Sequence, residues 1–193
     1  RSLVGSEMCI RDRNYKINHS VMGIEADEET LCRIMLDLQH QGAHNINLVT
    51  PAPHVPLIAR TLPLARQTGL TIPVVYNTNA YENVQTLKML EGLIDIYLPD
   101  FKYVSSLLAK RYSDAEDYFD VAAKAIAEMY RQVGNIKLDE NGMAASGVLI
   151  RHMVLPGCVD DTRRVLDYVS ANYPKNVYIS ICLLYTSPSP RDS

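Results

Sequence analysis

Short apolar runs alternate with amphipathic segments along most of this chain, and this alternation constrains its fold more than any other feature. Five runs are nearly continuous in apolar residues, which is typical of strands that are covered on both faces. They comprise residues 45–50, 72–77, 94–99, 147–155 and 177–181. The segments between them carry the apolar spacing of helices. The pattern therefore predicts an α/β fold with a parallel sheet.

Helices are expected at residues 26–41, 55–68, 82–92, 118–133 and 160–172. The first opens with three acidic residues, which suit a helix amino terminus, and it ends at Gly42. The pair Asn141-Gly142 predicts a turn over Leu138–Gly142. Periodicity alone leaves open whether the sheet is a doubly wound open sheet or a partial barrel. In both folds, functional groups gather at the carboxyl ends of the strands.

The two ends of the chain do not continue these patterns, and both resemble translated sequencing-library adapters. Residues 3–13 match one strand of a transposon-end adapter, and residues 182–192 match the opposite strand. Such added segments are excluded from fold reasoning. We therefore expect three parts: an adapter-derived segment at 1–13, an α/β core at 14–181, and a second adapter-derived segment at 182–193.

Composition narrows the class of protein. The core holds 15 of the 19 basic and 19 of the 22 acidic residues, a net charge of −4 without basic blocks, so no nucleic-acid partner is expected. Only Cys32 and Cys158 lie in the core, too few for a disulfide framework, which indicates a reducing cytoplasm. No apolar run is long enough for a membrane span, so no membrane partner is expected.

Candidate site residues, most of them polar, lie at or after the ends of the predicted strands, at the edge where a ligand would bind. They comprise Thr50 and Pro51 after the first strand, Asn77 and Asn79 at the second, Asp100 and Lys102 after the third, and Arg151 and Val154 in the fourth. The two cations would favour a ligand with a carboxylate or phosphate, arginine by bidentate hydrogen bonding. Asp100 could hold a ribose hydroxyl or balance Lys102.

Structural interpretations compete with these roles. Asn79 could cap a helix or form a turn, and Asp100 with Lys102 could be a solvated ion pair. Arg151 lies inside an apolar strand, where an unpaired charge is costly, so a functional role is favoured. His152 faces the opposite side of that strand and is interpreted as a packing residue. No histidine or cysteine spacing indicates a metal site in the residues present.

Four strings of residues carry a family resemblance. In order, NINLVTP, VYNTNAY, YLPDFKY and GVLIRHMVLPG resemble the pyruvate formate-lyase activating-enzyme-like branch of the radical S-adenosylmethionine (SAM) superfamily. The resemblance implies a partial (β/α)6 TIM-like barrel. It also implies a 4Fe-4S cluster, which the family holds through a C-x-x-x-C-x-x-C loop after its first strand. That strand, that loop and all three cysteines are expected upstream of Asn14 and are missing here.

The resemblance also implies roles for the residues at the strand ends. Thr50 and Pro51 occupy the place of a Gly-Gly-Glu motif that holds the SAM amino group, although the glycines and glutamate are absent. Asn77 and Asn79 match an Asp-Thr-Asn-Gly stretch in the ribose and methionine region, where this chain has an amide in place of the aspartate and Ala80 in place of the glycine.

The remaining roles come from the third and fourth strands. Asp100 and Lys102 match an Asp-x-Lys strand end near the SAM carboxylate and ribose, and Arg151 matches an arginine that approaches that carboxylate and the substrate. Val154 opens a turn near the adenine. Asp160 and Asp161, which follow it, are interpreted as caps of the last helix.

The family chemistry is the reductive cleavage of SAM to a 5′-deoxyadenosyl radical, which abstracts hydrogen from a substrate. The implied partners are a protein substrate, as in activating enzymes, and an electron donor such as flavodoxin or ferredoxin. The chain as given is expected to be inactive, because the cluster ligands are missing. The alternative is a cluster-free α/β module or metabolic barrel enzyme that binds an anion through Lys102 and Arg151.

Overall fold

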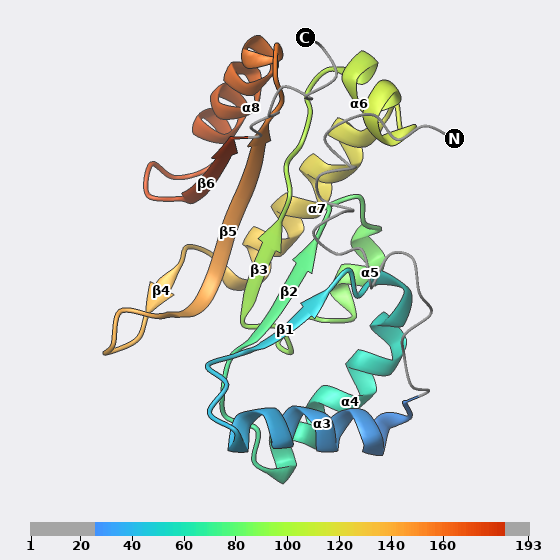
Figure 1. Ribbon diagram of the computed structural model, residues 1–193, viewed down its shortest axis with the longest axis vertical. Helices are drawn as coiled ribbons and strands as arrows, with labels where there is room; N and C mark the ends of the chain where they lie inside the picture. The colour runs from blue at the N-terminus through green and yellow to red at the C-terminus, as the bar shows by residue number, and fades with distance from the viewer. Residues whose placement is uncertain (1–25, 184–193) are drawn as a thin grey trace, which may run out of the picture.

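The structure is a computed structural model that describes residues 26–183 (Figure 1). The adapter assignment of residues 1–13 and of 184–193 therefore falls outside the described residues, as does the stretch at Asn14. Within residues 26–183, no helix is both long enough and apolar enough to cross a membrane.

Five parallel strands lie side by side in the order in which the chain reaches them. They are β1 (Ile46–Val49), β2 (Val74–Thr78), β3 (Ile96–Pro99), β5 (Ala144–Val154) and β6 (Tyr178–Leu183). A doubly wound sheet reverses its strand order at a switch point, whereas this order never reverses. The sheet is not closed. The structure thus confirms the parallel α/β sheet and resolves the open alternative in favour of a partial barrel.

Strand β6 crosses the predicted boundary at Ile181. Its last two residues, Cys182 and Leu183, pair with Met153 and Val154 of β5. The parallel ladder thus continues for two residues into the segment that the sequence assigns to the adapter.

A hairpin precedes the parallel part of β5 and lies against the amino-terminal half of the sheet. The short strand β4 (Lys137–Leu138) is antiparallel to the first residues of β5, as the predicted turn requires. At Gly147, β5 leaves β4 and begins to pair with β3. Gly147 has φ +118, and a Cβ there would lie 2.4 Å from the carbonyl oxygen of Asn135. Only glycine fits this crossing without moving the backbone.

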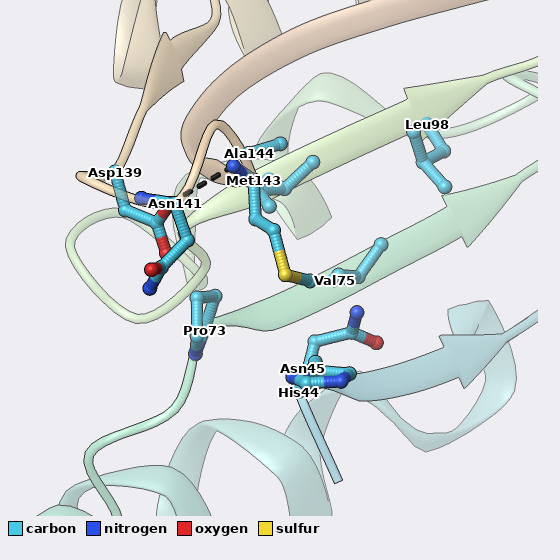
Figure 2. A pocket seen from close by; sticks show the side chains of 10 residues that line it. His44, Asn45, Pro73, Val75, Leu98, Asp139, Asn141, Met143 and Ala144 are labelled. Atoms are coloured by element: carbon cyan, nitrogen blue, oxygen red, sulfur yellow. Dashed lines mark hydrogen bonds between the residues drawn. The ribbon is translucent and has the colours of Figure 1, made fainter.

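The hairpin and the inner face of the sheet line a half-open cavity of about 400 Å³ (Figure 2). Met143 projects from the hairpin towards Val75 of β2. Asp139 fixes the turn, because its Oδ1 accepts hydrogen bonds from the backbone N–H groups of Asn141 and Met143, both at 2.8 Å. The complete lining consists of His44, Asn45, Pro73, Val75, Ile96, Leu98, Asp139, Asn141, Met143 and Ala144.

The helices are α3 (Glu28–His40), α4 (Val55–Thr68), α5 (Val84–Lys88), α6 (Ser106–Ser113), α7 (Tyr118–Val133) and α8 (Val159–Asn172), with a 3-10 turn at Ala52–His54. The predicted bounds of α4 and α7 are confirmed to the residue. The helix predicted at 82–92 is shorter, because turns replace it after Lys88. Helix α6 was not predicted from the sequence.

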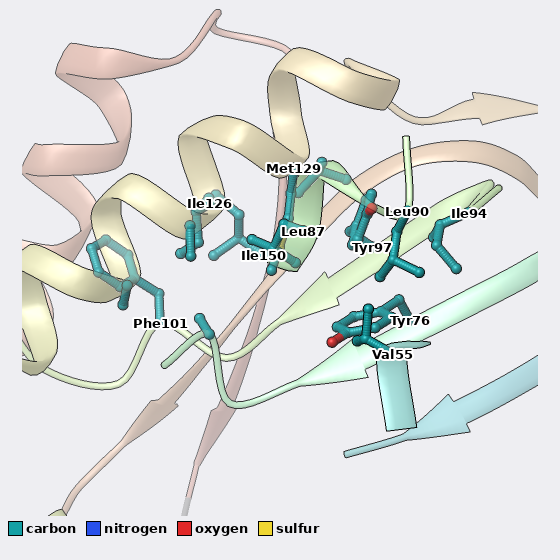
Figure 3. Close-up of a cluster of buried hydrophobic side chains, with 14 of the residues drawn as sticks. Val55, Tyr76, Leu87, Leu90, Ile94, Tyr97, Phe101, Ile126, Met129 and Ile150 are labelled. Carbon is teal, nitrogen blue, oxygen red and sulfur yellow. The ribbon is translucent and has the colours of Figure 1, made fainter. Parts of the chain in front are cut away.

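The hydrophobic core fills the space between the helices and one face of the sheet (Figure 3). Alternate residues of three neighbouring strands, Tyr76, Tyr97 and Ile150, point to this face and are fully buried. Ile126 and Met129 of α7 pack against them. Because side chains alternate along a strand, the residues between these point to the other face, which is the interior of the partial barrel.

Candidate functional site

Three predicted site residues, near or just after the ends of β2, β3 and β5, meet at the carboxyl end of the sheet. Arg151 of β5 donates from Nε to Asp100 Oδ1 at 2.8 Å, and its Nη2 lies 2.6 Å from the same oxygen. Nη2 also donates to Asn77 Oδ1 of β2 at 2.7 Å. A backbone bridge between Asp100 and Arg151 fixes the register that brings the two side chains together. We call Asn77, Asp100 and Arg151 the rim cluster.

The rim cluster leaves several polar atoms for a ligand. Both contacts from Arg151 end on one oxygen of Asp100, and Oδ2 accepts no hydrogen bond from residues 26–183. Arg151 Nη1 is likewise without a protein partner within that range. The side chains of Arg151 and Asp100 are 35% and 29% exposed, so solvent and small molecules reach them. The cluster thus offers an acceptor and a donor to a bound molecule.

Lys102 is the second cation of this rim. It is partly buried, and its ammonium forms no ion pair with a carboxylate of the described chain. The interpretation of Asp100 and Lys102 as an ion pair is therefore wrong, because Asp100 is paired with Arg151 instead. With Asp100 and Arg151 neutralising each other, Lys102 contributes the net positive charge of the rim.

A buried tyrosine joins the two loops that carry these residues. The hydroxyl of Tyr118, at the start of α7, lies 2.6 Å from the carbonyl oxygen of Asp100 and 2.9 Å from that of Asn79. It also accepts a hydrogen bond from the backbone N–H of Lys102 at 3.1 Å. Burial raises the pKa of Tyr118 far above its ordinary value, so the hydroxyl stays protonated and can donate.

Asn79 follows the structural interpretation in part. Its Oδ1 accepts a hydrogen bond from the backbone N–H of Tyr81 at 2.9 Å, which is an Asx turn. The side chain is exposed, and its amide nitrogen remains free of the described chain. The next residue, Ala80, has φ +63, a conformation that favours glycine. This matches the place where the family pattern has glycine.

Thr50 and Pro51 lie beside β2 but offer little side-chain chemistry. The N–H of Thr50 donates to the carbonyl oxygen of Asn77 at 2.8 Å, and Thr50 is held at φ +52. Pro51 is buried and has no N–H, and its carbonyl oxygen accepts from His54. An amino group could therefore meet only the Thr50 hydroxyl or backbone carbonyl groups here.

Strand β5 confirms the interpretation of His152 as a packing residue. His152 is buried and satisfied, with Nδ1 2.7 Å from the carbonyl oxygen of Phe101 and Nε2 3.0 Å from the Thr162 hydroxyl. Val154 ends β5 and pairs with Leu183, away from the rim cluster in the ladder.

The interpretation of Asp160 and Asp161 as helix caps is wrong. Asp161 is buried, and its carboxylate accepts from the backbone N–H groups of Val104 and Ser105 at 3.1 and 2.8 Å. It therefore holds the loop after β3 rather than the end of its own helix. Asp160 is exposed and contacts Arg163.

Sequence reasoning missed Tyr118 and Asp161 because both act on the backbone of distant loops. Tyr118 is the first residue of α7 and was not singled out from the sequence, because nothing in its neighbours indicates contact with Asn79. A possible signal was the spacing of tyrosines around the strand ends, since Tyr81 and Tyr103 both pack on its ring, with centroids 6.2 and 5.4 Å away.

The cavity in Figure 2 lies at the other end of the strands and contains none of the eight predicted site residues. Its lining is mostly apolar. Among residues 26–183, no group of three or more histidine, cysteine, aspartate or glutamate side chains is placed to hold a metal ion.

Comparisons with known proteins agree with this architecture. No family model matches the chain. It is 31% identical over 144 residues to the uncharacterized protein MJ0674 of Methanocaldococcus jannaschii, a match that covers 73% of this chain and 37% of that protein. Its structure resembles methylornithine synthase (PylB), with a TM-score of 0.55 and 14% identity over 86% of this chain and 46% of the other. The chain shares the fold of the part of that enzyme that it matches. It spans less than half the length of either protein.

Proposed function

We propose that this chain is the SAM-binding part of a radical SAM enzyme. Three observations support the proposal: the four sequence strings, the fold shared with methylornithine synthase, which is a radical SAM enzyme, and the rim cluster. The rim cluster carries the argument, because residues 74 positions apart in the chain converge on one polar site at the carboxyl ends of the strands.

The donor and acceptor groups at the rim fit the chemical groups of SAM. Asp100 Oδ2 can accept from a ribose hydroxyl, because Arg151 occupies only the other oxygen. Lys102 and the free Nη1 of Arg151 can donate to the ligand carboxylate, and charge-assisted bonds of this kind are the strong ones. Asn79 adds a free amide nitrogen. The ligand amino group has the weakest provision, since Thr50 and Pro51 replace the family motif.

The residues described here bind and orient, and they do not supply the redox chemistry. Bound SAM supplies a carbon–sulfur bond whose reductive cleavage starts hydrogen abstraction. The 4Fe-4S cluster does not fit residues 26–183, which contain no ligand set for it, so no step through the cluster is derived from them. Arg151 holds Asp100 and Asn77 in fixed orientations, and Lys102 attracts the carboxylate end of the ligand.

Within the superfamily, the sequence strings favour the activating-enzyme-like branch, with a protein substrate and flavodoxin or ferredoxin as electron donor in a cytoplasmic setting. A C-x-x-x-C-x-x-C motif upstream of Asn14 in the gene would support the superfamily. Its absence would favour the alternative, a cluster-free module that binds an anion through the same two cations.

Binding of S-adenosylhomocysteine, measured by calorimetry, tests the proposal. Lys102→Met removes one charge-assisted bond of about 2 kcal/mol, so the affinity should fall about thirtyfold. Lys137→Met is the control, because Lys137 is an exposed lysine on β4 at the opposite end of the strands. Equal affinities of the two variants would refute the site. Binding of inorganic phosphate in place of S-adenosylhomocysteine would favour the alternative.

A further inference from the structure

The segment from Asp100 to Ser105 carries Lys102 and is held at both ends by side chains from elsewhere in the chain. On one side, the Tyr118 hydroxyl contacts the backbone of Asp100 and Lys102. On the other side, the Asp161 carboxylate accepts from the N–H groups of Val104 and Ser105. The segment itself has no helix or strand structure over residues 101–105.

The Tyr118 contact also connects this segment to the preceding loop. Its hydroxyl reaches the carbonyl oxygen of Asn79, which follows β2, so one atom lies between the two loops of the proposed site. Tyr118 is only 2% exposed, and its ring packs between Tyr81 and the buried Tyr103, so packing fixes its position. The packed ring therefore fixes the position of the hydroxyl, whose polar contacts are to the backbone of Asn79, Asp100 and Lys102.

We propose that Tyr118 is a positioning residue that sets the distance between the Asn79 loop and the Lys102 segment, and so places Lys102 for the carboxylate of the ligand. Asp161 holds the far end of the same segment. Tyr118 touches no ligand in this arrangement, because all three partners of its hydroxyl are backbone groups. This inference rests on the proposed function for the identity of the ligand but not for the geometry.

A matched pair of variants separates positioning from stability. Tyr118→Phe removes the hydroxyl between the loops. Tyr97→Phe removes another hydroxyl from a fully buried tyrosine, one that donates to Gln132 Oε1 at 2.7 Å on the helix-covered face of β3. Tyr97→Phe loses one donated hydrogen bond, whereas Tyr118→Phe loses its donated bond and also the one that it accepts from the Lys102 N–H, so both variants should be destabilised and Tyr118→Phe by more. Only Tyr118→Phe should disturb the rim.

Ligand affinity is the first readout. Tyr118→Phe should bind S-adenosylhomocysteine about tenfold more weakly than the wild type, while 5′-methylthioadenosine, which lacks the carboxylate, should lose much less. Tyr97→Phe should bind both ligands as the wild type does. Equal losses for the two ligands, or the same loss in both variants, would show that Tyr118 acts only on stability and would overturn the positioning role.

Hydrogen exchange supplies a second readout that needs no ligand. In Tyr118→Phe, peptides covering residues 79–82 and 100–105 should exchange faster than in Tyr97→Phe, while peptides from α4 stay unchanged in both. Asp161→Asn should accelerate hydrogen exchange at residues 103–106. If Tyr118→Phe does not fold, Asp161→Asn takes its place as the test of how this segment is held. Unchanged exchange at these loops would refute the inference. If the wild type does not bind S-adenosylhomocysteine, the proposed function is refuted. The hydrogen-exchange result alone would then decide whether Tyr118 positions the two loops.

Discussion

Removing the guanidinium of Arg151 should destabilise the protein by about 2 kcal/mol, because it leaves partners unpaired inside the partial barrel. Breaking a fully buried ion pair costs about 3–5 kcal/mol, and an exposed pair contributes about 0–1 kcal/mol. The two side chains are 35% and 29% exposed, which places the pair between these limits. Arg151→Met keeps the aliphatic stem and so isolates the charge and its hydrogen bonds.

A double-mutant cycle then measures the interaction itself. Asp100→Asn keeps the shape of the side chain and removes its charge, and the double variant should recover about 1 kcal/mol relative to the sum of the single variants. Urea unfolding followed by circular dichroism or by tyrosine fluorescence suits the chain, which has 12 tyrosines and no tryptophan. An unchanged m-value, the slope of the unfolding free energy against urea concentration, would show that the variants change only the stability of the fold.

The control is Arg163→Met, since Arg163 contacts Asp160 at 3.4 Å with both side chains largely exposed. Its effect should stay within about 0.5 kcal/mol. Strict additivity of Arg151→Met and Asp100→Asn would refute the reasoning, because it would mean that the two side chains do not interact in solution.

Two further predictions follow from the structure. Gly147→Ala should lower the free energy of unfolding by about 4 kcal/mol or more, or prevent cooperative unfolding, because its Cβ would lie 2.4 Å from the Asn135 carbonyl oxygen. The control Gly142→Ala, with φ +76 but open space around the Cβ, should lower it by only about 1 kcal/mol. Similar losses of stability in both variants would contradict the steric argument. The hydrogen bond from Arg131 lowers the pKa of Glu128 to about 2 from 4.5, so this carboxylate stabilises the fold above pH 4.5 and its contribution is lost as the pH falls towards 2. Glu128→Gln should therefore flatten the dependence of stability on pH between these two values. An unaltered acid unfolding profile would argue against the pairing.

Strong local signals account for the elements that the sequence predicted well. Helix α4 ends at Gly69, which adopts φ +114, and α7 ends at Gly134, so both carboxyl ends are encoded at single positions. Helix α6 was missed because Ala109 is its only buried residue, which leaves almost no apolar period. Its start depends on Ser105, whose backbone is held by Asp161 from far along the chain.

The sequence predicted where the candidate site lies, but not which of its side chains bind one another. Parallel strands bring their carboxyl ends together, so Asn77, Asp100 and Arg151 could be expected at one edge. The sequence favoured Arg151 as a ligand contact, whereas the structure gives most of its donors to Asp100 and Asn77. That outcome depends on strand register, which local pattern does not encode between strands joined by long crossovers.

The unbroken strand order has a consequence for how the molecule holds together. Each strand–helix unit contacts chiefly the unit before and the unit after it, much as in a solenoid. Cohesion is therefore distributed along the row of strands rather than concentrated in one central element. Such a row can gain or lose a unit at either border without rerouting the remainder, and the rim cluster spans three adjacent members of it, from β2 through β3 to β5.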